Sequence, residues 1–144
     1  MANKMSIING NYPTEVKTLT LIACIAQEQK VEMTRRINHT GLSLTQLQML
    51  HILSEGPDEG MTVNQLKEQM IDDSPNASRA VNKLVQAEYA LKNRSEVDQR
   101  IVYVQITESG AKAHIECDQL LMDMSLGLSE SETEQLYQLL AKVK

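Results

Sequence analysis

The stretch Leu91–Gly110, LKNRSEVDQRIVYVQITESG, contains two short runs that resemble β-strands. The runs are Leu91–Arg94 and Ile101–Ile106, and a charged turn joins them. Thr107 follows the second run directly, and threonine is a favoured residue at the N-cap of a helix. The stretch therefore predicts a β-hairpin that leads into a helix.

Two patterns typical of helix starts precede this hairpin. Thr45-x-x-Gln48 stands before an apolar periodic segment, and Thr62-x-x-Gln65 opens a shorter segment that reaches about Met70. In such a capping box, the hydroxyl and the side-chain amide each satisfy a backbone N–H group that the helix leaves free. The patterns predict two helices before the hairpin.

A third helix is predicted directly before the hairpin. Ser74 is suited to be its N-cap, and Pro75 suits the first helical position. The helix is expected to end near Tyr89, and its inward stripe is formed by Val81, Leu84 and Val85. Short helices followed by a β-hairpin outline a winged helix-turn-helix over residues 41–107, within a mainly α (α+β) fold.

The sequences at the two ends of the chain predict long helices. These helices carry more apolar surface than a single domain can bury. Apolar residues recur in steps of three and four over residues 14–39, and Ser129-x-x-Glu132 begins the last of the C-terminal helices. We expect a loose arm over residues 1–13, dimerisation helices over residues 14–40 and 108–144, and six helices in all. The alternative is that these helices pack only within the monomer.

Composition limits the class of protein. The chain has 144 residues, 42% of them hydrophobic and 23% charged, as expected for one soluble globular domain. It contains no apolar run of the roughly 20 residues that span a bilayer, and no secretory signal. We therefore expect a cytoplasmic protein without a membrane partner, whose two cysteines, Cys24 and Cys117, are buried thiols.

The charge is unevenly distributed along the chain. The net charge is −5, but residues 74–106 hold five basic and three acidic residues, so this window is +2 and the rest is −7. A local positive face on an acidic body can still bind phosphates, with modest affinity that depends on salt.

The most specific motifs of the chain lie in the same window. They are SRAVNKLV at residues 78–85, RSEVDQR at residues 94–100 and VQITESG at residues 104–110. The Asp98-x-Arg100 pair, with Ile-Thr-x-x-Gly a few residues later, resembles the signature of the MarR family of transcription regulators. The resemblance covers about residues 14–143 in element order. One departure is Glu88, near the place where the family usually has a glycine that ends the third helix.

The resemblance implies which residues would contact double-stranded DNA. The third helix would enter the major groove, where arginine can bind guanine and asparagine adenine, while serine and lysine more often hold phosphates. In the hairpin, Arg100 would reach the minor groove, Lys92 and Arg94 would suit phosphates, and Asp98 would brace Arg100 or the turn. The candidates on the helix are Ser74, Asn76, Ser78, Arg79, Asn82 and Lys83. The alternative is a solvated polar surface that touches no DNA.

These observations predict a sequence-specific DNA-binding regulator. We expect a homodimeric repressor that binds a palindromic operator and is released by a small molecule. A winged-helix module that binds another protein is the rival interpretation. An enzyme is not expected, because the three histidines have no nearby triad partners and the chain has no glycine-rich phosphate loop.

The sequence indicates less clearly which signal would release the protein from DNA. A small apolar or phenolic ligand is expected. The eight methionines suggest a deformable core that could admit such a ligand, although gap filling within the core is the slightly favoured alternative. Cys24 offers a redox-sensing alternative, although an inert thiol is favoured. No cofactor or metal is expected. His114 and Asp118 share a helix face, but the zinc-sensing branch of the family has a Glu-His pair where this chain has Leu47-Gln48.

Overall fold

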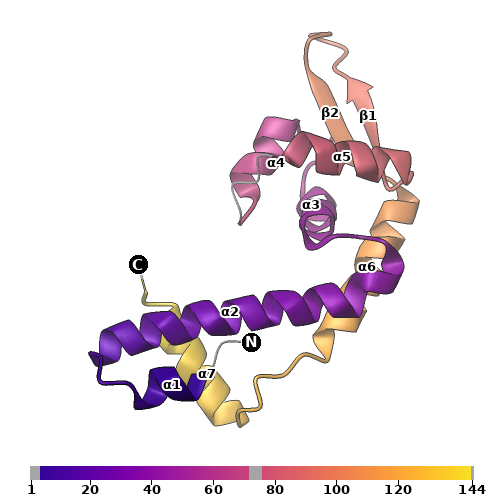
Figure 1. Cartoon of the computed structure of the whole chain (residues 1–144). Coiled ribbons are helices and arrows are strands. Elements are labelled where there is room, and N and C mark those ends of the chain that lie inside the picture. Colours follow the sequence, from indigo (N-terminus) through magenta and orange to yellow (C-terminus); the bar gives the residue numbers. More distant parts are fainter. Residues whose placement is uncertain (1–3, 72–75, 144) are drawn as a thin grey trace.

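The computed structural model describes residues 4–71 and 76–143 as helices arranged around one hairpin (Figure 1). None of the helices in these ranges combines the length and the apolarity that a membrane span requires. In chain order the elements are α1 (Lys4–Asn9), α2 (Thr14–Ile37), the 3-10 turn η1 (Asn38–Thr40), α3 (Leu44–Glu55), α4 (Val63–Gln69), α5 (Ala77–Gln86), β1 (Ala90–Arg94), β2 (Val102–Ile106), α6 (Glu108–Met122) and α7 (Glu130–Leu140).

The elements form two groups in space (Figure 1). Helices α3, α4 and α5 and the hairpin β1–β2 lie together, and we call them the winged unit. Helices α1, α2 and α7 lie on the other side of the molecule, and we call them the outer helices. Helix α6 runs from the hairpin to the outer helices and packs against both α2 and α3. The mainly α fold with one hairpin is the one that the sequence predicts.

The hydrophobic core lies mainly in the winged unit, with Ile37 of α2 and Cys117 of α6 packed against it. Helix α3 supplies the centre, with Met49 and Leu50 inaccessible to solvent. The other large side chains that are fully buried are Ile37, Leu66, Val81, Leu84, Val104 and Cys117. Burial of each such aliphatic side chain stabilises a fold by about 1.5–3 kcal/mol relative to exposure. The inward stripe predicted for the third helix is confirmed, with Val85 partly buried at its edge.

A residue outside the hairpin, Met61, connects the hairpin to the helices through a single β-bridge. Strands β1 and β2 are antiparallel, and Ala90 is paired with Ile106. Met61 forms a bridge on the other side of β2, where its N–H and C=O groups bond to Val104 at 3.0 and 2.8 Å. A Cβ atom on Gly60 would lie 2.3 Å from the carbonyl oxygen of Val104, so only glycine permits this close approach.

Three of the four predicted helix caps that the structure describes are confirmed, and one is wrong. Thr62, Thr107 and Ser129 are N-caps, the first and last within capping boxes. Helix α3 begins two residues earlier than Thr45 predicts, because Ser43 and Gln46 form the capping box there. Both pairs fit the same motif. The buried residues Leu42 and Leu47 stand at the positions of a hydrophobic staple around Ser43.

The boundaries of α5 also differ from the prediction. The helix begins at Ala77 with Asn76 as its N-cap residue, whereas Ser74 and Pro75 lie outside the described residues. It ends at Gln86, and Glu88 adopts a left-handed conformation with φ of 61°. Glutamate thus occupies the conformation that usually requires glycine after a helix, at some cost in backbone strain.

Tertiary contacts hold Glu88 in this conformation. The hydroxyl groups of Thr107 and Ser109 both donate to its carbonyl oxygen at 2.7 Å. Tyr89 N–H also bonds back to the carbonyl of Leu84 at 2.9 Å. A Cβ atom on Gly110 would lie 2.0 Å from the carbonyl oxygen of Tyr89. The start of α6 therefore packs directly on this turn and stabilises it.

The segment predicted as a loose arm contains helix α1. Lys4 forms an ion pair with Glu28 of α2 at 2.5 Å, and Lys17 donates to the carbonyl of Ile8 at 3.0 Å. Helix α1 has no buried residue, however, and neither has α7. Helix α1 thus contacts α2 without adding to the core.

Candidate nucleic-acid interface

Helix α5 has one buried and one exposed face. Ala77, Ala80, Val81 and Leu84 are buried beneath it. The helix and its N-cap expose polar residues on the other side, namely Asn76, Ser78, Arg79, Asn82 and Lys83. The face is therefore able to offer hydrogen-bond donors, acceptors and positive charge to a partner.

Arg79 and Lys83 are one helical turn apart on this face. They border a hollow of about 170 Å³ between α5 and the start of α3, whose other lining residues are Ser43, Thr45, Gln46, Asn76 and Ala80. The guanidinium group of Arg79 makes no hydrogen bond or ion pair with the described residues, so all of its donors can face solvent. Hydroxyls and cations gathered in this way suit an anionic ligand.

A hydrogen bond connects α5 to the hairpin β1–β2, which we also call the wing. Lys92 Nζ in β1 donates to Asn82 Oδ1 at 2.7 Å. The ammonium group thus holds the asparagine side chain in one orientation, with its NH₂ group free to donate elsewhere. Sequence reasoning selected both residues but did not pair them, because they belong to different elements.

The loop of the hairpin is shaped by its own polar groups. Asp98 Oδ1 accepts from the backbone N–H of Arg100 at 3.0 Å, and Ser95 Oγ accepts from the N–H groups of Val97 and Asp98 at 3.2 and 3.3 Å. Arg94 donates to the carbonyl of Gln99 at 2.9 Å. These bonds fix the conformation of the loop backbone that carries Arg100.

Arg100 itself is exposed at the end of the wing. Within residues 4–71 and 76–143 its guanidinium group has no ion pair, and Asp98 bonds only to its backbone. The side chain is therefore available to a ligand. Arg94, in contrast, is partly engaged with the loop, which leaves it fewer free donors.

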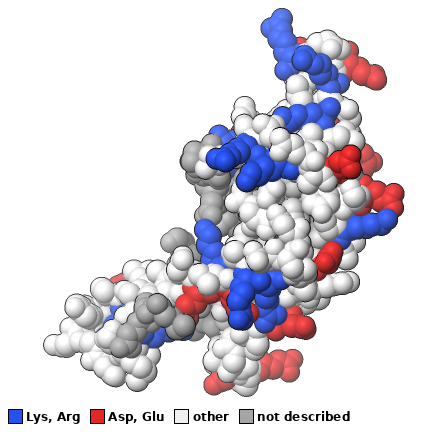
Figure 2. Space-filling model, turned by 45° about the vertical axis from the view of Figure 1, so that its right-hand side comes forward, with Lys and Arg blue, Asp and Glu red and all other residues white. Residues whose placement is uncertain are grey.

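Charge is sorted across the surface as well as along the sequence. Figure 2 shows lysine and arginine side chains at the end of the hairpin and on the surface below it, with a further basic cluster lower in the view, whereas acidic side chains lie mainly along the right-hand edge and near the bottom. The hairpin end also carries Glu96 and Asp98, so its field is mixed rather than uniformly positive. A partner with regularly spaced negative charges would be attracted to the basic side.

The structure brings together most of the predicted contact residues. Those on α5 and those on the hairpin lie on neighbouring elements that the bond between Lys92 and Asn82 connects. Ser74 falls outside the described residues. Sequence reasoning missed Gln105. Its side-chain amide donates to the carbonyl of Asp58 at 2.8 Å and its oxygen accepts from Asn93 in β1. These bonds hold β2 to β1 and to the loop before β2's bridge partner Met61. The alternation within β2 was the only available signal for Gln105.

Known proteins of the same family and fold are regulators of transcription. The family model described as transcriptional regulator SarA/Rot matches residues 18–116. A MarR-like transcription regulator from Bacillus cereus is 17% identical with a TM-score of 0.79, over 89% of this chain and 94% of the other. No curated protein sequence matches significantly.

Two similar structures contain DNA. A mutant of MarR from E. coli, in complex with operator DNA, is 22% identical with a TM-score of 0.72, over 85% of this chain and 90% of the other. The S. aureus MepR–DNA complex is 22% identical with a TM-score of 0.68, over 92% and 96%. The MarR fold that the sequence motifs predict is thus confirmed, and the chain belongs to the SarA/Rot family of transcriptional regulators.

Proposed function

We propose that the protein is a homodimeric, sequence-specific repressor that binds a palindromic operator and leaves it when a small molecule binds. The observation that carries this proposal is the exposed polar face of α5, with Arg79 free of partners in the described chain, beside a hairpin that presents Arg100. The MarR and MepR complexes with DNA support it at the level of the fold. Because its ligand would be genomic DNA, we place its action in the cytoplasm.

Each contact residue has a role that its chemistry allows. Arg79 would bind a guanine edge with two donors, and the NH₂ group of Asn82, oriented by Lys92, would donate to a base or phosphate oxygen. Asn76 would bind an adenine edge, and the sugar-phosphate backbone would be held by Ser74, Ser78, Lys83, Lys92 and Arg94. Arg100 would enter the minor groove, where a narrow A·T tract concentrates negative potential.

The homodimer rests on the apolar surface of the outer helices. Leu19, Ile22 and Ile25 of α2 are 58%, 37% and 37% exposed, and Leu139 and Leu140 of α7 are 63% and 45% exposed. Large exposed apolar patches on a protein surface commonly mark an interaction site. A second copy is the natural partner, because soluble regulators of this architecture are commonly two-fold dimers that match two-fold operators.

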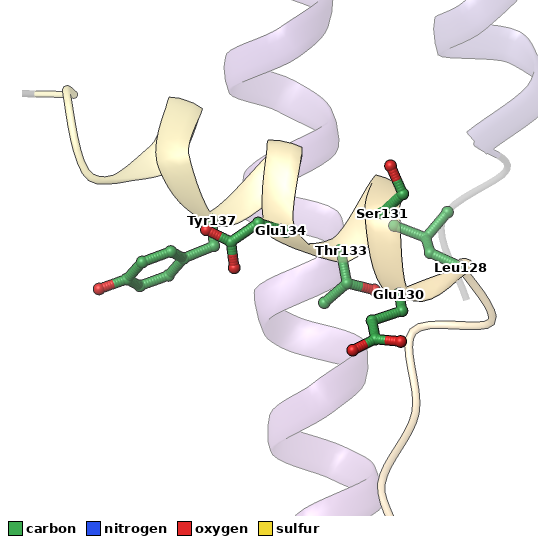
Figure 3. A pocket seen from close by; sticks show the side chains of 6 residues that line it. All are labelled: Leu128, Glu130, Ser131, Thr133, Glu134 and Tyr137. Atoms are coloured by element: carbon green, nitrogen blue, oxygen red, sulfur yellow. The ribbon is translucent and has the colours of Figure 1, made fainter.

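A hollow along α7 fits the same arrangement. Its lining residues, Leu128, Glu130, Ser131, Thr133, Glu134 and Tyr137, come only from α7 and the residues just before it (Figure 3). Tyr137 is 65% exposed although its ring is largely apolar. The hollow therefore has one wall in this chain, and the second copy would supply the other.

The effector would bind between the winged unit and the outer helices. A cavity of about 550 Å³ lies there and is lined by residues of α2, α3 and α6, including Ala26, Met33, Leu44, Leu47 and Leu121. Cavities of roughly 300–1,000 Å³ with mostly apolar walls accept drug-sized ligands. A small apolar or phenolic molecule in this place would change how the winged unit sits on α2 and α6.

The proposal is tested by selection of bound duplexes from a random DNA pool, followed by fluorescence anisotropy at several salt concentrations. We expect an inverted repeat with half-sites about 34–36 Å apart. We also expect affinity to fall steeply with salt, with a slope of about −0.9 per phosphate contacted. Recovery of no common sequence, or binding that salt does not weaken, would favour a winged-helix module that docks a protein.

A further inference from the structure

Three metal-ligating side chains meet at the boundary between α3 and α6. His51 comes from α3, and His114 and Asp118 lie one turn apart on α6. His51 Nδ1 is 3.2 Å from His114 Nε2, which is 3.2 Å from Asp118 Oδ2. All three ligand atoms lie within 4.8 Å of one another. His114 is buried, whereas His51 is exposed and the Asp118 side chain is 48% exposed.

Protons alone satisfy this arrangement poorly. A neutral His114 with hydrogen on Nε2 has one proton for two acceptors, Asp118 and a lone pair on His51. If Nε2 carries a lone pair instead, it can accept from His51, but that lone pair then faces the carboxylate. In either tautomer, two electron-rich atoms approach one another with no proton between them. A cation placed among the three atoms would accept one lone pair from each of them.

Two of the three spacings also fit a tetrahedral ion. With zinc bonds of about 2.0–2.1 Å, neighbouring ligands of a tetrahedron lie about 3.3–3.4 Å apart. The two observed distances of 3.2 Å are within a few tenths of an ångström of that value. We propose that His51, His114 and Asp118 form a binding site for Zn²⁺ that joins the winged unit to helix α6.

Three protein ligands leave one coordination position of zinc for water or another small ligand. His51 and Asp118 also line the 550 Å³ cavity between α2, α3 and α6. The ion thus has an entry path from solvent, and its open position faces a space that can hold a second ligand. The donor set of two imidazoles and one carboxylate is typical of zinc and related divalent transition metals.

This proposal departs from the sequence-based expectation of no metal. The pair His114 and Asp118 is visible in the sequence, but His51 is 63 residues away and only the packing of α3 on α6 brings it there. The site also differs from the Glu-His pair of the zinc-sensing branch, because this chain has Leu47-Gln48 at that place. Zinc binding does not depend on the proposed operator or effector.

The test is a zinc titration of the full chain after removal of metal with EDTA and desalting, in competition with a chromophoric chelator. We expect one zinc ion per chain. His51→Ala should weaken binding by at least about 100-fold, since even residues that only support a ligand contribute 10–100-fold. Asp118→Asn should cause a smaller loss. Because His51 is exposed, its removal should leave the circular dichroism spectrum unchanged.

His39→Ala is the matched control. His39 is the third histidine of the chain, lies 61% exposed near Glu116, and has no part in the cluster. The His39→Ala protein should bind zinc like the parent. When Co²⁺ replaces zinc, the His39→Ala protein and the parent should both show the strong visible absorption of tetrahedral cobalt. His51→Ala should lose that spectrum. Absence of stoichiometric zinc, or equal losses in His39→Ala and His51→Ala, would overturn the proposal.

Discussion

The winged unit and the outer helices are built from similarly apolar sequences but differ in what they bury. In the winged unit, Leu50 of α3 and both Val81 and Leu84 of α5 are fully buried, and these two helices pack against each other. In the outer helices, only Ile37 at the end of α2 is buried, and no residue of α1 or α7 is buried. The difference supports the proposal that the outer helices pack against a second copy, whereas the winged unit buries its core within one chain.

The largest expected effect tests the outer helices. Leu19→Glu places a charge on the exposed apolar face of α2, where Leu19 is 58% exposed in the single chain. We expect the variant to fold but to sediment as a monomer at micromolar concentration, since a buried unpaired charge is strongly unfavourable in an interface. Binding to a palindromic operator should fall with it.

Ile71→Glu provides the control for this experiment. Ile71 is 90% exposed and lies outside the outer helices, so its substitution should leave the dimer intact. A parent protein that sediments as a monomer, or a Leu19→Glu protein that still dimerises, would break the comparison between the two regions.

The second effect tests the winged unit. Leu84→Ala removes a fully buried side chain from α5 and should lower the free energy of unfolding by about 2–5 kcal/mol. Urea unfolding monitored by circular dichroism measures this loss. Leu139→Ala, at a residue that is 63% exposed in α7, should instead give a loss that becomes smaller on dilution. Similar losses at all concentrations for both variants would remove the distinction.

The third effect separates the two arginines within the winged unit. Arg79→Ala should cost about 1–3 kcal/mol and relax the preference for one base pair per half-site, if the guanidinium binds guanine. Arg100→Ala should weaken binding broadly and most in A·T-rich flanks, if its side chain reads the width of the minor groove. Anisotropy titrations on a panel of mutated operators distinguish the two patterns.

The control for the arginines is Lys112→Ala. Lys112 on α6 is paired with Glu108 at 2.7 Å and lies outside the candidate interface, so its loss should leave affinity unchanged. If Arg79→Ala weakened every operator equally, Arg79 would contact phosphate rather than a base.

The smallest expected effect concerns the thiols of the two regions. Burial raises the pKa of the Cys117 thiol in α6, so at neutral pH it holds even less thiolate than an ordinary cysteine. Cys24 is half-buried in the middle of α2, away from a helix N-terminus. Cys24→Ser should therefore bind the operator and respond to peroxide as the parent does, which is hardly at all. Release of the parent by low hydroperoxide, with the Cys24→Ser protein still bound, would establish Cys24 as a sensor.

Local chemistry in the sequence determined most of the elements. Capping at Thr62, Thr107 and Ser129 depends on residues three positions away, so the start of each helix can be predicted without knowledge of the fold. The same holds for the stripe that buries Val81 and Leu84, because a helix places residues three and four apart on one face. The winged architecture followed from the order of these elements.

Only the tertiary structure decided features that depend on distant residues. Glu88 takes a left-handed conformation because Thr107 and Ser109 hold its carbonyl, and Met61 joins β2 from a loop about forty residues earlier in the sequence. The meeting of His51 with His114 and the bond between Lys92 and Asn82 depend in the same way on how helices and strands pack. Residue periodicity indicates which face of an element is buried, but it does not determine which distant residue packs against that face.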